Sequence, residues 1–144
     1  MSEETKELFK KFGFEIITKE INDVEVIRSY LVITPFSFYN GDPLTVCVVE
    51  YKDGLLLTDF GCVEGVLKKT GLADDAKNKT KLQAILSEHG AFNADIHKNM
   101  ESEIGGFFED KDFRDDFFMF SRLLMRISAW IETTVILSKG EKHV

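Results

Sequence analysis

The sequence predicts an α+β fold, and three observations carry this prediction. From Phe14 to Phe60, β-branched and aromatic residues recur in short runs with period two, which is typical of strands. From Asp112 to Leu137, apolar residues recur every three or four positions, which is the spacing of one helix face. Two shorter segments between these regions also have helical spacing. We therefore expect an antiparallel β-meander of about four or five strands, packed against a long C-terminal helix and two shorter middle helices.

Composition is that of an ordinary globular chain. Its 144 residues, of which 44% are apolar, suffice for one core and contain no linker or repeat, so residues 1–144 are expected to form a single α+β domain. The net charge of −7 disfavours nucleic acid as a partner, because phosphate binding needs a basic stripe. No apolar run reaches membrane-spanning length and the N-terminus lacks a signal core, so no membrane partner is expected. With Cys47 and Cys62 expected as buried, reduced thiols, the predicted localisation is cytoplasmic.

In the first half of the chain, turn and cap residues mark the expected elements. Ser2 can cap a helix over residues 2–12, and Gly13 can end it. Asp53 and Gly54 form a favoured two-residue hairpin turn. The expected strands lie near residues 14–20, 24–34, 44–51 and 55–59.

The second half is expected to be mainly helical. Helices are predicted from Gly61 to Lys69 and over residues 75–89, and residues 91–109 are expected to form a second hairpin or two short edge strands. The C-terminal helix has apolar residues outside its main stripe, which are Phe118, Met119, Leu123, Met125 and Trp130. Such a helix needs cover on two sides. Either it is central in the monomer, or a partner or a second copy covers it as a homodimer.

Several short motifs resemble one known family. They are Thr34-Pro35-Phe36, Gly41-Asp42 before an apolar strand, Thr58-Asp59-x-Gly61 after a glycine hairpin, the helix ending "KKTG", and the later "KLQAILSEHG" before the long helix. Together they resemble the bacterial and phage family DUF1828 over most of the chain. The resemblance implies a small α+β domain found near prophages and mobile elements, and it implies no established activity.

A metal site is one interpretation of the strand that contains "VVEYK". If Asp53-Gly54 is the centre of the turn, Glu50 faces Leu57 and Val48 faces Asp59, so Asp59 lies diagonal to Glu50. Asp42, Glu50 and Lys52, possibly with Asp59, then resemble a PD-(D/E)XK nuclease, in which carboxylates hold Mg²⁺. The plainer interpretation is a hairpin with ordinary turn residues, which needs no cofactor. We favour the hairpin.

Asp59 stands where a strand is expected to become a helix. It can cap the helix by accepting hydrogen bonds from backbone N–H groups of the first turn. An anion site at the same helix start is the alternative, but a carboxylate there would repel phosphate. The cap is the expectation we favour.

Acidic and aromatic residues alternate in "ESEIGGFFEDKDFRDD". They could form a surface for a basic protein partner, or simply a solvated loop and an acidic helix start that complements the helix dipole. The candidate partner-binding residues are Glu101, Glu103, Phe107, Phe108, Glu109, Asp110, Asp112, Asp115 and Asp116.

We find no catalytic signature in the sequence. The three histidines show no metal-ligand spacing, and no Ser-His-Asp or Cys-His set is visible. The favoured function is therefore a small cytoplasmic protein-interaction domain of phage or mobile-element type that binds a host or defence protein through its acidic and aromatic surface. The alternative is the Mg²⁺-dependent nuclease, and only that alternative requires a cofactor.

Overall fold

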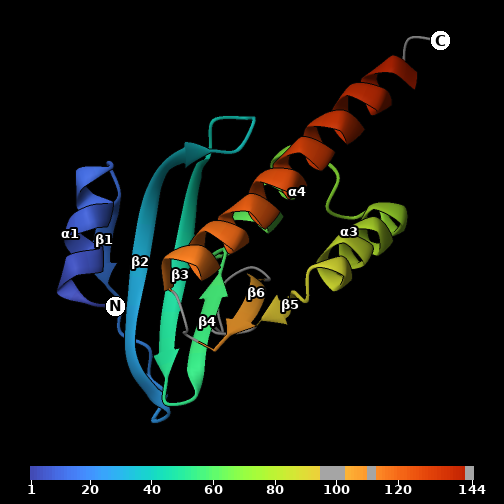
Figure 1. Cartoon of the computed structure of the whole chain (residues 1–144). Coiled ribbons are helices and arrows are strands. Elements are labelled where there is room, and N and C mark those ends of the chain that lie inside the picture. The colour runs from blue at the N-terminus through green and yellow to red at the C-terminus, as the bar shows by residue number, and fades with distance from the viewer. Residues whose placement is uncertain (95–102, 110–112, 142–144) are drawn as a thin grey trace.

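The computed structural model of the chain describes residues 1–94, 103–109 and 113–141. The predicted α+β class is confirmed, since within these residues a six-stranded antiparallel sheet is accompanied by four helices. The long C-terminal helix crosses the sheet and continues well beyond it (Figure 1). The elements are α1 (Glu3–Lys11), β1 (Glu15–Thr18), β2 (Val26–Ser37), β3 (Pro43–Tyr51), β4 (Gly54–Thr58), α2 (Cys62–Lys69), α3 (Ala76–Glu88), β5 (Phe92–Ala94), β6 (Glu103–Phe108) and α4 (Phe113–Glu141).

Local signals place the first elements much as predicted. Ser2 caps α1, because its side chain accepts a hydrogen bond from the backbone N–H of Thr5 at 3.1 Å. β1 is shorter than expected, since it pairs with β2 only as far as Thr18. β2 begins later and ends later than expected, and all its neighbours are antiparallel.

The β3–β4 hairpin turns one residue earlier than predicted. Lys52 and Asp53 are the two turn residues, and Glu50 pairs with Leu55 rather than with Leu57. The predicted register is therefore wrong by two residues. A shift of two keeps every side chain on its predicted face of the sheet but changes its partner.

Gly54 accounts for this register. It is the first residue of β4, and β6 passes beside it so closely that a Cβ atom on Gly54 would lie 2.3 Å from the carbonyl oxygen of Phe108. Only glycine fits this position without movement of the backbone. The β3–β4 ladder ends at Thr58, so Asp59 lies beyond it and does not face Val48 as predicted.

The sheet is not a simple meander. Its strand order is β1-β2-β3-β4-β6-β5, so β6 lies between β4 and β5. Of the two alternatives predicted for residues 91–109, the structure supports the paired strands of a second hairpin, because β5 and β6 pair antiparallel with Phe92 opposite Gly105. α2 and α3 come between β4 and this hairpin in the chain, so β6 returns over a long connection to pair with β4.

The main core lies on one face of the sheet. On that face Val46 and Leu57 pack in one buried cluster with side chains from all four helices. The opposite face holds a smaller cluster built around Cys47, Val49 and Leu56, against which loop and strand side chains pack. The described helices thus share one side of the sheet.

α4 supplies the largest part of that core. It has 29 residues and is about 44 Å long at the usual helical rise. Phe113 of its predicted main stripe is half-buried, and the other members are buried: Phe117, Phe120, Leu124, Ile127 and Ile131. The residues predicted outside this stripe are divided: Leu123 is buried and Trp130 half-buried, whereas Phe118, Met119 and Met125 are exposed. Over the described ranges, no helix is both long enough and apolar enough to cross a membrane.

Candidate functional site

The two carboxylates of the predicted metal site lie at opposite ends of β3. Asp42 precedes the strand and Glu50 is its last residue but one. Eight residues of extended chain separate them by about 26 Å. The structure therefore does not bring Asp42 and Glu50 together, and Lys52 lies in the turn beyond Glu50.

Each of these carboxylates has cationic neighbours of its own. The Lys69 ammonium group lies 2.8 Å from Asp42, and this hydrogen bond holds the pKa of the Asp42 carboxyl below its usual value. Glu50 contacts the amino group of Met1, and the Arg28 Nε atom lies 3.9 Å from Glu50. The Asp42–Lys69 pair is at the surface, whereas the contact of Glu50 with Met1 is partly buried. These ion pairs join strand, helix and N-terminal segment.

Metal-ligating side chains do not converge in the described structure. Over residues 1–94, 103–109 and 113–141, there is no group of three histidine, cysteine, aspartate or glutamate side chains placed to hold a metal ion. Both cysteines are free. Burial raises the pKa of the Cys47 thiol to about 12 and that of Cys62 to about 11, so both are protonated at neutral pH and poor ligands in that form.

Asp59 is a buried helix cap. Its carboxylate accepts hydrogen bonds from the backbone N–H groups of Gly61 at 3.0 Å, Val63 at 2.9 Å and Ile104 at 2.8 Å. The predicted cap is thus present, and the same side chain also ties β6 to the start of α2. Burial raises the pKa of Asp59 to about 6 despite these three donors.

Glu103 belongs to the same buried junction rather than to the surface. Only 1% of it is exposed, and Thr58 donates a hydrogen bond to Glu103 from its hydroxyl at 2.8 Å. The adjacent backbone is tightly curved, since Phe60 and Gly61 both have left-handed conformations with φ of 55° and 78°. We call Thr58, Asp59 and Glu103 the buried polar junction.

No feature of the sequence marked Glu103 as buried. Carboxylates are seldom buried without partners, and this one stood in a strongly acidic segment. Alternation alone places Glu103 on one face of β6, but it does not say that β5 and β4 lie on either side of that strand. Glu103 is therefore removed from the predicted partner-binding surface.

The remaining acidic and aromatic residues are divided between surface and core. Phe108 is half-buried and packs against the main core, while Glu109 and Asp115 are exposed and Asp116 is partly exposed. Phe107 is 52% exposed. The predicted residues Glu101, Asp110 and Asp112 lie outside the described residues.

Four residues near β6 and the start of α4 are grouped under one name, the rim surface. Phe107 pairs with Leu56 and so projects on the face of the sheet opposite to the helices, whereas Met119 lies on α4. Phe107 and Met119 line the same small cavity of about 80 Å³, between β6 and the first turns of α4. Met119 is 61% exposed, and Asp116 precedes it by one helical turn. Glu109 follows β6 directly. The rim surface therefore consists of Phe107, Glu109, Asp116 and Met119.

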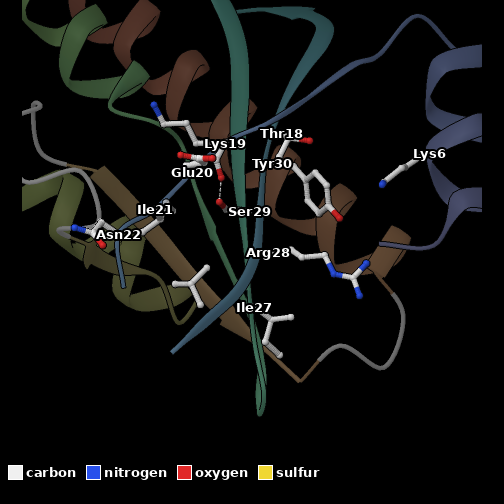
Figure 2. Close-up of a pocket in the computed structure, with 11 residues that line it drawn as sticks. Lys6, Thr18, Lys19, Glu20, Ile21, Asn22, Ile27, Arg28, Ser29 and Tyr30 are labelled. Atoms are coloured by element: carbon white, nitrogen blue, oxygen red, sulfur yellow. Dashed lines mark hydrogen bonds between the residues drawn. The ribbon is translucent and has the colours of Figure 1, made fainter. Parts of the chain in front are cut away.

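A second surface feature lies beside β2. β1 pairs with β2 only from Tyr30 to Ile33, and an open pocket of about 770 Å³ lies beyond the end of β1. Figure 2 shows Lys6 and Arg28 on one side of β2 and Lys19 on the other, so these cationic groups do not meet.

The contacts within this pocket are structural. The Lys6 ammonium group lies 4.9 Å from the centre of the Tyr30 ring, which is a cation–π contact. The Ser29 hydroxyl donates a hydrogen bond to the Lys19 carbonyl, drawn as a dashed line in Figure 2. The first contact joins α1 to β2, the second holds the segment after β1 against β2, and neither forms a catalytic set.

Comparison with other proteins finds no relative. No family model matches the chain, and neither does any of the curated proteins or solved structures with which it was compared. The resemblance to DUF1828 therefore stays a prediction.

Proposed function

We propose that the chain is a small cytoplasmic protein-interaction domain that binds a partner protein through the rim surface. In keeping with the predicted phage or mobile-element type, the proposed partner is a host or defence protein. The observation that carries the proposal is the exposure of Phe107 and Met119, 52% and 61%, within three positions in the sequence of the carboxylates of Glu109 and Asp116.

This combination suits protein recognition for physical reasons. Exposed Phe and Met side chains gain free energy when a partner removes them from water. Aromatic residues and methionine are enriched at interfaces, and carboxylates at the edge select a partner of opposite charge. The proposed partner therefore presents an apolar group flanked by lysine or arginine.

Nothing in the geometry favours the nuclease alternative. Its three proposed residues do not share a site, because Asp42 and Glu50 lie at opposite ends of β3 and Lys52 is in the turn. Asp59, the optional fourth member, is engaged with three backbone N–H groups inside the protein.

The proposal is tested by site-specific cross-linking. A photoreactive phenylalanine analogue replaces Met119 in the full chain, which is then irradiated in a lysate of the cells that naturally produce it. The matched control carries the same analogue at Val24, which is fully exposed in the loop between β1 and β2. We expect a cross-linked protein at position 119 that is absent at position 24.

Charge reversal then tests recognition. Glu109→Lys in the Met119-labelled chain should reduce the cross-link by about tenfold, because it sets a like charge against a basic partner. Added salt should weaken the cross-link as well. Equal cross-linking at positions 119 and 24, or a cross-link indifferent to Glu109→Lys, would overturn the proposal.

A further inference from the structure

α4 carries a line of exposed residues on the flank of the helix next to its buried stripe. They are spaced alternately by four and three positions, the spacing of a coiled-coil seam. We call them the outer stripe: Phe118, Arg122, Met125, Ala129, Glu132 and Ile136.

The outer stripe is distinct from the stripe that packs on the sheet. Phe117, Leu124 and Ile131 mark the buried side of α4, and the helical repeat places the outer stripe about a third of a turn away from them. At this flank the Phe118 ring also contacts the rings of Phe9 and Phe14, with centroids 6.1 and 6.4 Å apart. All six of its members are exposed.

The large apolar members of the outer stripe are costly to leave in water. Phe118 is 42% exposed, Met125 is 40% exposed and Ile136 is 60% exposed. They follow one line over 18 residues of helix, a length of about 27 Å. In Figure 1 this part of α4 begins over the sheet and continues beyond it. A second long helix would fit along such a line.

We propose that the outer stripe binds the outer stripe of a second copy of this chain, with the two α4 helices antiparallel and the two-fold axis crossing the stripe midway between Met125 and Ala129, at the level of Ile127 along the helix. The antiparallel arrangement follows from the order of residues along the stripe. Rotation about this axis brings each member of the stripe to face a residue equally far from Ile127 on the other side.

Each facing pair is then complementary. Phe118 faces Ile136 of the second copy, and both are large and apolar. Met125 faces Ala129, so a long side chain meets a short one, as close packing requires.

The charged pair within the stripe is complementary too. Arg122 faces Glu132 of the second copy, and the symmetry forms this ion pair twice. The next layer outward would place Asp115 opposite Lys139, again with opposite charges. These charges therefore favour a second copy of the chain as the binding partner of the outer stripe, and they favour the antiparallel orientation of its α4 helix.

In a parallel arrangement of the two α4 helices, the facing residues would not be complementary. A parallel two-fold pair sets every residue against its own counterpart, so Arg122 would face Arg122 and Glu132 would face Glu132. Like charges at close range repel. The sequence of the stripe is therefore compatible with one direction of packing and opposes the other.

A single helix pair is a small interface, so the dimer should dissociate on dilution. Sedimentation velocity of the full chain, from low micromolar to high micromolar concentration, should show the mass rising from one chain to two. A monomeric mass over the whole range would overturn the proposal.

Charge exchange then tests the pairing. Arg122→Glu places a second glutamate opposite Glu132, and Glu132→Arg sets two arginines together, so each single variant should raise the dissociation constant by about tenfold or more. The double variant Arg122→Glu/Glu132→Arg restores opposite charges and should recover dimerisation. Lys79→Glu, on the exposed side of α3, changes the net charge as Arg122→Glu does and should leave the dimer unchanged.

Recovery in the double variant distinguishes this register from any other. In a parallel pair, or in a dimer formed through another surface, the double variant would not regain what the single variants lost. Either result, or single variants that dimerise like the unmodified chain, would overturn the proposal. Because the rim surface is not altered by these changes, the cross-linking experiment succeeds or fails independently.

Discussion

Asp59 combines two roles that are usually separate, helix cap and link between strands. It accepts three backbone hydrogen bonds while buried. We predict that Asp59→Ala lowers the free energy of unfolding by about 3 kcal/mol or more, because buried N–H groups lose their acceptor. Urea unfolding measures this. Asp75→Ala is the control, since Asp75 caps α3 at the surface and its loss should cost about 1 kcal/mol. Equal losses in the two variants would contradict the assignment.

The same carboxyl predicts a pH dependence. The folded chain raises the pKa of Asp59 to about 6, whereas an unfolded Asp has a pKa of about 4. The folded state thus binds this proton more tightly, so its contribution to stability is present below pH 4 and is lost as the pH rises to 6.

Asp59→Asn removes this ionisation. We predict that the free energy of unfolding of the unmodified chain, minus that of the variant, falls by about 2 kcal/mol between pH 4 and pH 7. Taking the difference between the two proteins cancels the contributions of the other carboxyl groups to the pH dependence of stability. One of these is Asp42, whose lowered pKa acts in the opposite direction. A difference that stays constant with pH would refute the prediction.

Whether the role of a single residue could be predicted from the sequence depends on how close in the sequence its partners are. The cap by Asp59 was predictable because its Val63 donor lies four positions away. The burial of Glu103 was not, since its partner Thr58 is 45 positions away and belongs to a strand whose neighbours are unknown from sequence. An acidic segment was therefore assigned to the surface as a whole, although one of its members lies inside.

At the scale of elements, Gly54 makes a testable contribution. A Cβ atom there would meet the Phe108 carbonyl oxygen at 2.3 Å and the Phe107 ring at 2.9 Å. We predict that Gly54→Ala lowers the free energy of unfolding by about 2 kcal/mol or more, because β4 and β6 must move apart. The control is Gly90→Ala, where φ is 66° and no atom lies within 4 Å, so only backbone strain of about 1 kcal/mol applies. Denaturant unfolding that ranks the two in the opposite order would contradict this account.

Most elements could be predicted, because each has a local signal. Alternation marked β2 and β3, and the spacing of Phe117, Phe120 and Leu124 marked α4. The hairpin register was predicted wrongly, because the local signal favours Asp53-Gly54 as the turn, whereas the observed turn residues are Lys52 and Asp53. Contact with β6, which is distant in sequence, decides between the two turns.

At the scale of the whole molecule, the order of the strands was the main feature beyond prediction. The pairing of Leu56 with Phe107 joins residues that α2 and α3 separate in the chain. The polarity of each strand shows which face is buried but not which strand is its neighbour. The same limit applies to the candidate surfaces. The exposed stripe of α4 can be predicted from helical spacing alone, whereas predicting the rim surface requires knowing that β6 and α4 are neighbours.

Because β6 is synthesised well after its neighbour β4, the strand order also has a consequence during translation. β1 to β4 emerge from the ribosome first and can pair at once, but the free edge of β4 waits for residues about 50 positions later in the chain. That edge includes Leu55, Leu56 and Leu57. A leucine-rich strand edge is a template for pairing with other chains. A fragment cut short before β6 is thus exposed to aggregation, from which the complete chain is protected by its own sixth strand.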